Sequence, residues 1–242
     1  MYAVITAGGR VSGELAAALG TPVKALAKFG GRSMLERVIA AARQAGAKQV
    51  AVVGGEEVRA AAGDLVDRLI PEAGTGAQNV HLALGAFPDQ ALLYLTSDLP
   101  FIAAGPLVSF LRRVPPGALA MPLAAAEQYE RRFPGAPAHV TVFGSERIAN
   151  GSVFLIPAGV APRIDSVAQK LFNARKDVFG MARMLGPALL LKFALQRITI
   201  ADVEAKAMRL LGCPVFGVRD CAPELCFDLD TVEDYAYAFA HA

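Results

Sequence analysis

Short apolar runs alternate along the chain with longer stretches in which apolar residues recur every three or four positions. The short runs predict buried strands, and the longer stretches predict helices that cover them. This alternation favours the α/β class, with a mostly parallel sheet and helices on both of its faces. The predicted strands are Tyr2–Thr6, Gln49–Val53, Ala91–Thr96, Ala118–Pro122, Ser152–Ile156, Pro214–Val218 and Leu225–Leu229.

Helical periodicity predicts Ser33–Gly46, where one apolar stripe faces inward and Gly46 ends the helix. The other predicted helices are Asn79–Ala86, Ala103–Arg113 and Thr231–His241. Residues 127–150 are polar and contain Pro and Gly, which predicts loop and an edge strand. Residues 163–211 are largely helical, with a break at Pro187. We expect one domain, 1–242, with a helical insertion at about 163–211.

Composition narrows the class of protein. The net charge of +2 over 242 residues gives no basic surface for nucleic acid. No apolar run reaches the ~18 residues of a membrane span. The first predicted strand begins at residue 2, so we expect no signal peptide. Three cysteines, an odd number without zinc-site spacing, are expected to be reduced thiols. These features together predict a cytoplasmic protein.

The first strand runs directly into Ala7-Gly8-Gly9-Arg10. Adjacent glycines let the backbone approach a ligand closely, and amides freed in such a turn can bind phosphate oxygens. Arg10 and Lys24 would add positive charge for the same phosphates. Taken alone, the loop fits an ordinary strand-to-helix turn equally well, and Lys24 fits a solvated surface residue. A second loop of small residues leads into a helix, and its Gly76 and Asn79 would suit base or ribose contacts.

Three carboxylates follow predicted strands. Asp98 comes after Ala91–Thr96, at the sheet edge where open α/β proteins bind ligands, and is suited to hold Mg²⁺ against a triphosphate. Asp228 and Asp230 are two residues apart, so in a strand they would share a face, and their like charges would need a cation nearby. The alternative is helix capping, by Asp98 for one helix and by Asp230 or Thr231 for the last.

The order of these motifs resembles the MobA-like nucleotidyltransferases, over nearly the whole chain. The resemblance rests on short segments in family order: Ala7-Gly8-Gly9, Lys24-Ala25-Leu26, Gly30-Gly31-Arg32-Ser33-Met34-Leu35, Asp98-Leu99-Pro100-Phe101, Asn150-Gly151-Ser152-Val153-Phe154-Leu155 and Asp230-Thr231-Val232-Glu233-Asp234. The segment Ala174-Arg175-Lys176-Asp177 and the Leu-rich helices after it look like a poorly characterised branch of that family.

The resemblance implies a Rossmann-like α/β/α sandwich with a mixed, mostly parallel sheet, the fold shared with GT-A enzymes. It implies transfer of a nucleotidyl group from a nucleoside triphosphate to a phosphate or hydroxyl of a small-molecule acceptor, with release of pyrophosphate. Mg²⁺ (or Mn²⁺) would be the cofactor, with Asp98, Asp228 and Asp230 as metal ligands. Lys24 and Asp98 would be catalytic. The nucleotide would lie against Ala7, Gly8, Gly9, Arg10, Lys24, Gly76 and Asn79.

One position departs from the family pattern. The family loop reads Gly-Gly-x-Gly-x-Arg, and Glu14 stands near the place of its phosphate-binding Arg. Two alternatives to an active nucleotidyltransferase therefore stay open. One is a nucleotide-binding protein without catalysis, and the other is a GT-A glycosyltransferase that uses Asp228-Leu229-Asp230 as its metal site. Residues 170–197, basic and apolar, predict helices that cover the sheet or form a homodimer contact, with binding to an anionic membrane surface as the alternative.

Overall fold

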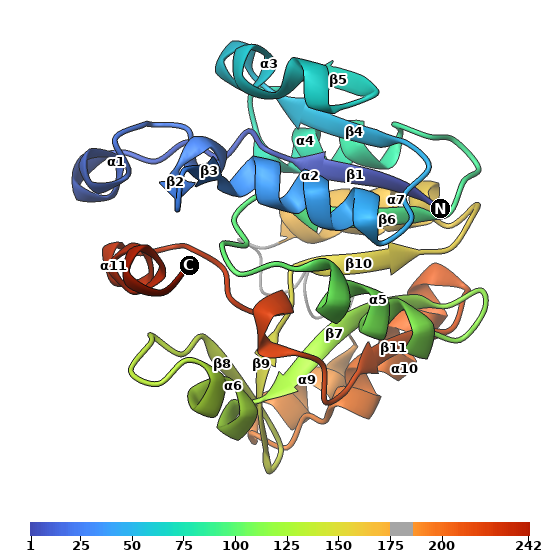
Figure 1. The fold of residues 1–242 in the computed structure, drawn as a ribbon. Helices are drawn as coiled ribbons and strands as arrows, with labels where there is room; N and C mark the ends of the chain where they lie inside the picture. Colours follow the sequence, from blue (N-terminus) through green and yellow to red (C-terminus); the bar gives the residue numbers. More distant parts are fainter. Residues whose placement is uncertain (175–185) are drawn as a thin grey trace.

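The computed structural model describes residues 1–174 and 186–242, and nine strands in these residues form one sheet (Figure 1). The strand order across the sheet is β5 (Arg68–Pro71), β4 (Val50–Gly54), β1 (Tyr2–Thr6), β6 (Leu92–Thr96), β10 (Val153–Ile156), β7 (Leu119–Ala125), β9 (Glu146–Asn150) and β8 (Val140–Phe143), and β11 (Val215–Val218) pairs with β7. All of them run in one direction except β9 and β10. The mixed, mostly parallel sheet confirms the predicted Rossmann-like α/β class.

Six of the seven predicted strands are present, with ends displaced by at most a few residues. The seventh, Leu225–Leu229, is wrong. Pro223 opens a 3₁₀ turn that ends at Leu225, and the following residues form no ladder. Phe227 and Leu229 are fully buried, and the Leu229 N–H donates to the carbonyl of Asp98 at 3.0 Å. A short buried apolar run therefore crosses the end of the sheet without joining it.

Helices cover both faces of the sheet (Figure 1). One face carries α2 (Met34–Gln44) and α5 (Ala104–Arg113), and the other carries α4 (Gly76–Leu84), α7 (Ala161–Ala174) and α10 (Ile200–Leu211). The predicted α2, α4, α5 and α11 (Val232–His241) are all present. Ser33 caps α2 through a reciprocal box with Glu36, and Gly46 has a φ of 91° beyond its end, so the local sequence sets both ends of α2.

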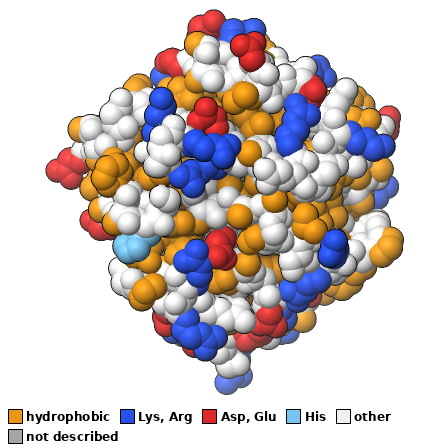
Figure 2. Space-filling model, in the orientation of Figure 1, with side chains coloured by type: hydrophobic (Ala, Val, Ile, Leu, Met, Phe, Trp, Pro, Cys, Tyr) orange, Lys and Arg blue, Asp and Glu red, His pale blue; other side chains and the backbone are white. Residues whose placement is uncertain are grey.

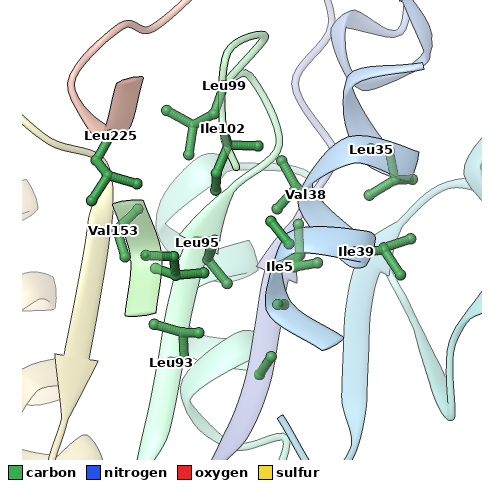
Figure 3. Close-up of a cluster of buried hydrophobic side chains, with 14 of the residues drawn as sticks. Ile5, Leu35, Val38, Ile39, Leu93, Leu95, Leu99, Ile102, Val153 and Leu225 are labelled. Carbon is green, nitrogen blue, oxygen red and sulfur yellow. The ribbon is translucent and has the colours of Figure 1, made fainter. Parts of the chain in front are cut away.

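Alternation along the central strands separates two cores. On β1, Ile5 packs toward α2, where it meets Val38 and Leu95 in a fully buried cluster (Figure 3). Its neighbour Val4 points to the opposite face and packs with residues of α4 and α7. Because both faces are covered, the central strands read as continuous apolar runs, which is why the sequence predicted them well.

Several short elements, of two to seven residues, were not predicted. They are α1 (Gly13–Leu19), a hairpin of β2 (Lys28–Phe29) and β3 (Arg32–Ser33), α3 (Glu56–Ala62), and β5. Residues 127–150 contain more order than loop and one edge strand, since α6 (Ala126–Arg132) precedes the hairpin of β8 and β9. The β8 edge strand itself agrees with the prediction.

The predicted helical insertion contains α7, α9 (Pro187–Ala194) and α10, and α9 begins at the predicted break, Pro187. The part of this prediction that falls on 175–185 lies outside the described residues. Apolar side chains are more than half exposed at Leu191, Phe193 and Leu195. Among the helices that the structure describes, none has the length and hydrophobicity needed to cross a bilayer. Acidic and basic side chains are interspersed over the face drawn in Figure 2.

Candidate active site

A pocket of about 480 Å³ lies at the carboxyl ends of β1 and β6. Both predicted loops and the end of β6 contribute to its wall, so residues far apart in the sequence meet here. Its lining residues are Thr6, Gly8, Gly9, Arg10, Lys24, Ala73, Gly74, Thr75, Gly76, Asn79, Val80, Tyr94, Thr96, Ser97 and Asp98. The position is the sheet edge at which open α/β sheets bind ligands, and the volume suits a small-molecule ligand.

Gly8 allows two side chains to pack directly on the glycine loop. A Cβ at this position would lie 2.3 Å from Glu72 Oε2 and 2.7 Å from Asn79 Nδ2. Glu72, which follows β5, therefore forms part of the pocket's surroundings. Sequence analysis missed Glu72 because β5 is only four residues long and none of its residues is fully buried, so nothing marked its end as part of a site.

Two predicted residues of the glycine loop have other partners. Ala7 is fully buried, and its N–H donates to the carbonyl of Val53 at 2.8 Å, so it does not line the pocket. Arg10 does line the pocket, but its Nη2 lies 2.9 Å from each carboxylate oxygen of Glu57 and 3.7 Å from Glu72 Oε1. Its charge is therefore matched within the protein. Glu14 is exposed in the first turn of α1 and does not line the pocket.

The second predicted loop forms the other side of the pocket. Thr75 caps α4, and its hydroxyl accepts from the N–H of Gln78 at 3.3 Å. Asn79 is 7% exposed, and its Oδ1 accepts from the N–H of Ala73 at 2.7 Å, which holds the loop on the helix. Gly76 opens α4 beside the pocket. N–H groups in the first turn of a helix lack helical acceptors and favour anionic or hydroxyl ligands.

Lys24 lies between two of the predicted carboxylates. Its Nζ is 2.7 Å from Asp98 Oδ2 and 2.5 Å from Asp230 Oδ1, and its side chain is 12% exposed. Burial alone would lower the pKa of Lys24, but the charges of Asp98 and Asp230 outweigh burial and raise the pKa above its ordinary value. Lys24 is therefore a firmly charged ammonium group at the pocket wall rather than a solvated surface lysine. Asp98 does not cap α5, whose N-cap is Ala103.

Asp228 is close enough to Lys24, Asp98 and Asp230 for their charges to affect its pKa. Burial, followed by the charge of Asp98, raises the pKa of Asp228 to about 7, although Ser152 Oγ donates to its Oδ2 at 2.6 Å. The expected strand geometry is absent here, so Asp228 and Asp230 do not share a strand face. Asp228 contacts Ser152, whereas Asp230 contacts Lys24.

The backbone before α11 is fixed by Asp234, a fully buried carboxylate. Its Oδ2 accepts from the N–H groups of Asp230 and Thr231 at 2.9 and 2.8 Å. In the opposite direction, the N–H of Asp234 donates to Thr231 Oγ1 at 3.1 Å. His139 Nε2 lies 3.2 Å from both of its oxygens. Thr231 thus caps the last helix, as one alternative predicted. Asp234 also holds the loop that carries Asp230.

Asp234→Ala is expected to destabilise the protein by about 2–4 kcal/mol, because partly buried N–H groups of the Asp230 loop lose a charged acceptor. Glu233→Ala is the matched control, since Glu233 is an exposed acid in the same helical turn. The control should lose at most ~1 kcal/mol, the contribution of one acid at a helix N-terminus. Urea unfolding of both variants measures the difference, and equal losses would contradict the role given to Asp234.

The carboxylates fit a metal ion that takes few protein ligands. Buried oxygens of two of them, Asp98 Oδ1 and Asp228 Oδ1, have no hydrogen-bond partner. Within residues 1–174 and 186–242, no group of three or more His, Cys, Asp or Glu side chains has metal-binding geometry. Mg²⁺ commonly binds one or two carboxylates and takes its other ligands from water and substrate phosphates. The unpartnered oxygens are therefore compatible with Mg²⁺ and with no closed protein cage.

Comparison with known proteins identifies a matching protein family. The model of one protein family, described as the MobA-like NTP transferase domain, matches residues 3–225. A comparison with curated proteins finds no significant match.

Among solved structures, a hypothetical transferase from Thermus thermophilus has a TM-score of 0.82 and 28% sequence identity, over 97% of this chain and 99% of that one. A nucleotidyl transferase from Methanothermobacter thermautotrophicus has a TM-score of 0.58 at 15% identity, over 99% and 96%. The 2-C-methyl-D-erythritol 4-phosphate cytidylyltransferase from Thermus thermophilus has 0.55 at 17% identity, over 99% and 97%. At these lower identities the likeness is one of fold.

Proposed function

Because the chain belongs to the family of MobA-like NTP transferase domains, and is thus a nucleotidyltransferase, we propose that it transfers a nucleotidyl group from a nucleoside triphosphate to a small acceptor with release of pyrophosphate. The observation that carries this proposal is the meeting of Lys24, Asp98 and Asp230 at the wall of a pocket built from two glycine-containing loops. We treat residues 1–242 as one domain whose insertion covers the sheet beside this pocket.

The triphosphate lies against Gly8 and Gly9, with the α4 N-terminus opposite. A phosphate oxygen or hydroxyl oxygen of the acceptor attacks the α-phosphorus, and the bond from that phosphorus to the bridging oxygen breaks. Lys24 neutralises the charge that grows on the α-phosphate as this happens. Positioning supplies much of the remaining rate, because little covalent assistance is needed in phosphoryl-type transfer.

Asp98 and Asp228 would hold a divalent cation through their unpartnered oxygens, with Asp230 as a further ligand once Lys24 turns to the phosphates. Mg²⁺ (or Mn²⁺) bound there would supply positive charge to the triphosphate and to the leaving pyrophosphate. Ser152 fixes the rotamer of Asp228 by donating to its other oxygen. Asp234 keeps the Asp230 backbone in place.

The triphosphate and its base are identified by a thermal-shift screen of ATP, GTP, CTP and UTP with Mg²⁺. A ligand at a hundred times its Kd stabilises a protein by ~2.7 kcal/mol, which corresponds to a rise in Tm of about 5–10 °C for a chain of this size. We expect one triphosphate to give this shift and to release pyrophosphate with a suitable acceptor. No shift with any triphosphate would contradict the proposal.

The two alternatives predict other outcomes of the same screen. A nucleotide-binding protein without catalysis would show the shift without pyrophosphate release across an acceptor panel. The engagement of Arg10 by Glu57 is the observation that favours this second candidate, since a phosphate-binding guanidinium is already paired. A glycosyltransferase would release a nucleoside diphosphate from a nucleotide sugar.

Membrane and homodimer contacts through 170–197 stay predictions, tested by co-sedimentation with anionic vesicles and by solution mass.

A further inference from the structure

A second cavity, of about 230 Å³, lies between α10 and the sheet. Strands β7, β10 and β11 form its floor. Two of its lining residues, Leu119 and Phe154, also pack in the core beneath α4 and α7, so the cavity opens on the same face of the sheet as α4. The nucleotide pocket lies at the N-terminus of α4. The two cavities are therefore neighbours on one face.

The wall of this second cavity is almost entirely apolar. Among its lining residues, Asn150 and Glu204 are the two with polar side chains. Asn150 Nδ2 donates to Thr141 Oγ1 at 3.0 Å, and Glu204 Oε1 accepts from the N–H of Gly217 at 2.7 Å. Each of these side chains thus has one polar atom that is hydrogen-bonded within the protein. The cavity offers a ligand contact area rather than hydrogen bonds, and it suits an aliphatic or aromatic group.

The cavity is open to solvent rather than a void in the core. Val203 and Phe216 line it, and their exposed fractions are 40% and 37%. Exposed apolar clefts of soluble proteins are common at ligand sites.

Two connections lead from the cavity to the candidate active site. Asn150 lines the cavity, and two residues later Ser152 donates to Asp228 at 2.6 Å. Cα atoms two residues apart are separated by at most about 7 Å. A ligand that fills the cavity can therefore place one end beside Asp228.

The second connection is aromatic. The ring of Phe154, in the cavity wall, meets the ring of Tyr94 edge-on, with centroids 6.0 Å apart. Tyr94 lines the nucleotide pocket, and its hydroxyl lies 3.0 Å from Thr6 Oγ1. The nucleotide pocket and the apolar cavity thus share a wall one aromatic pair thick.

We propose that the apolar cavity binds the hydrophobic part of the acceptor, so that the acceptor is an amphiphile. Its hydroxyl or phosphate reaches the carboxylates around Lys24, and its aliphatic or aromatic part lies against α10. An apolar cavity of about 150 Å³ can hold benzene, so this larger one suits a group of roughly six to ten carbons. This inference rests on the proposed function for the identity of the ligand as acceptor, but its binding test needs no turnover.

The test measures binding of 1-alkanols and of alkyl monophosphates with two to ten carbons, by calorimetry or ligand-observed NMR. Each methylene that enters the cavity should tighten Kd about fourfold, until a plateau near eight carbons. The alkanol and phosphate arms show which reacting group the site prefers. A Kd independent of chain length in both arms would overturn the proposal.

Ala207→Phe fills the cavity, because Ala207 lines it from α10. Ala205→Phe is the matched control, since Ala205 lies on the same helix and lines a different cleft, beside α9. The Ala207 variant should lose the chain-length dependence, and the control should keep it. The same triphosphate-induced thermal shift in both proteins shows that the fold and the nucleotide pocket are intact. Unchanged alkyl binding in Ala207→Phe would overturn the proposal.

Phe216→Ala provides a second test that does not depend on filling the cavity. Removing this ring enlarges the cavity at its rim, so the plateau should move to longer chains by about two to four carbons. A plateau at the same chain length would contradict the proposal that the cavity binds the alkyl chain. A third outcome is chain-length-dependent binding that Ala207→Phe abolishes, together with no pyrophosphate release from any triphosphate. This result would support the cavity as a binding site, but it would overturn both the proposed function and the ligand's assignment as acceptor.

Discussion

Asp98→Asn is expected to lower the rate of metal-dependent pyrophosphate release on the order of 10³-fold or more, with the fold preserved. Asparagine has the shape of aspartate but neither its charge nor its affinity for a divalent cation. Asp98 Oδ1 is buried without a partner, so in the free protein the substitution disturbs little beyond the contact to Lys24, which keeps Asp230. The loss should therefore appear in catalysis and not in packing.

Pyrophosphate release at saturating triphosphate and Mg²⁺ measures this effect, and Tm shows that the fold is intact. Asp64→Asn is the control, because Asp64 is an exposed acid in the turn after α3 and does not line the pocket. The control should retain the wild-type rate. Chelation of the divalent ion should silence the wild-type enzyme as well. An Asp98 variant that turns over at the wild-type rate with Mg²⁺ would remove Asp98 from the metal site.

The sequence predicted the strands correctly where helices cover both faces of the sheet. Strand β1 has its predicted bounds because its apolar run is continuous and covered on both faces. Leu225–Leu229 is also a short, mainly apolar run, but Pro223 and one tertiary hydrogen bond to Asp98 hold it outside the ladder. A strand and a buried segment that crosses the end of a sheet can have the same apolar sequence pattern. They differ only in whether the backbone pairs with a neighbouring strand.

The site was predictable where a residue type carries chemistry and not where position alone matters. Lys24, Asp98 and Asp230 stood out as charges after loops or strands, and the structure brings all three together. Glu72 joins the pocket's surroundings only because Gly8 lacks a Cβ, a relation that no local pattern reveals. Asp234 is one of two acids in the first turn of α11, and nothing in the sequence sets it apart from Glu233, yet it orders the loop of Asp230.

The pairing of Arg10 was equally hidden. Glu57 lies in the first turn of α3, far along the chain, and sequence gives no sign that it faces the glycine loop. The family's phosphate-binding Arg has no counterpart at Glu14. Under the proposed function, positive charge at the triphosphate would therefore depend on Lys24 and a cation, unless Arg10 leaves Glu57. This dependence makes Lys24 the second sensitive position.

Lys24→Ala is expected to lower kcat on the order of 10²-fold or more, with a smaller change in KM, because the ammonium acts on charge that develops in the transition state. Lys28→Ala is the control, since Lys28 is an exposed lysine four residues away, on β2. A rise in KM with kcat unchanged would indicate that Lys24 contributes to ground-state binding instead. An unchanged rate would return Lys24 to the role of a structural cation.

A second measurement on the same variant separates catalysis from structure. Without a divalent ion, Lys24 is the cation between Asp98 and Asp230, so its loss leaves two carboxylates facing each other and should lower Tm by about 5 °C. A divalent cation that binds these carboxylates would replace the missing charge. Mg²⁺ should therefore raise the Tm of Lys24→Ala more than that of the wild type. An equal response would place the metal away from Asp98 and Asp230, whatever the fate of kcat.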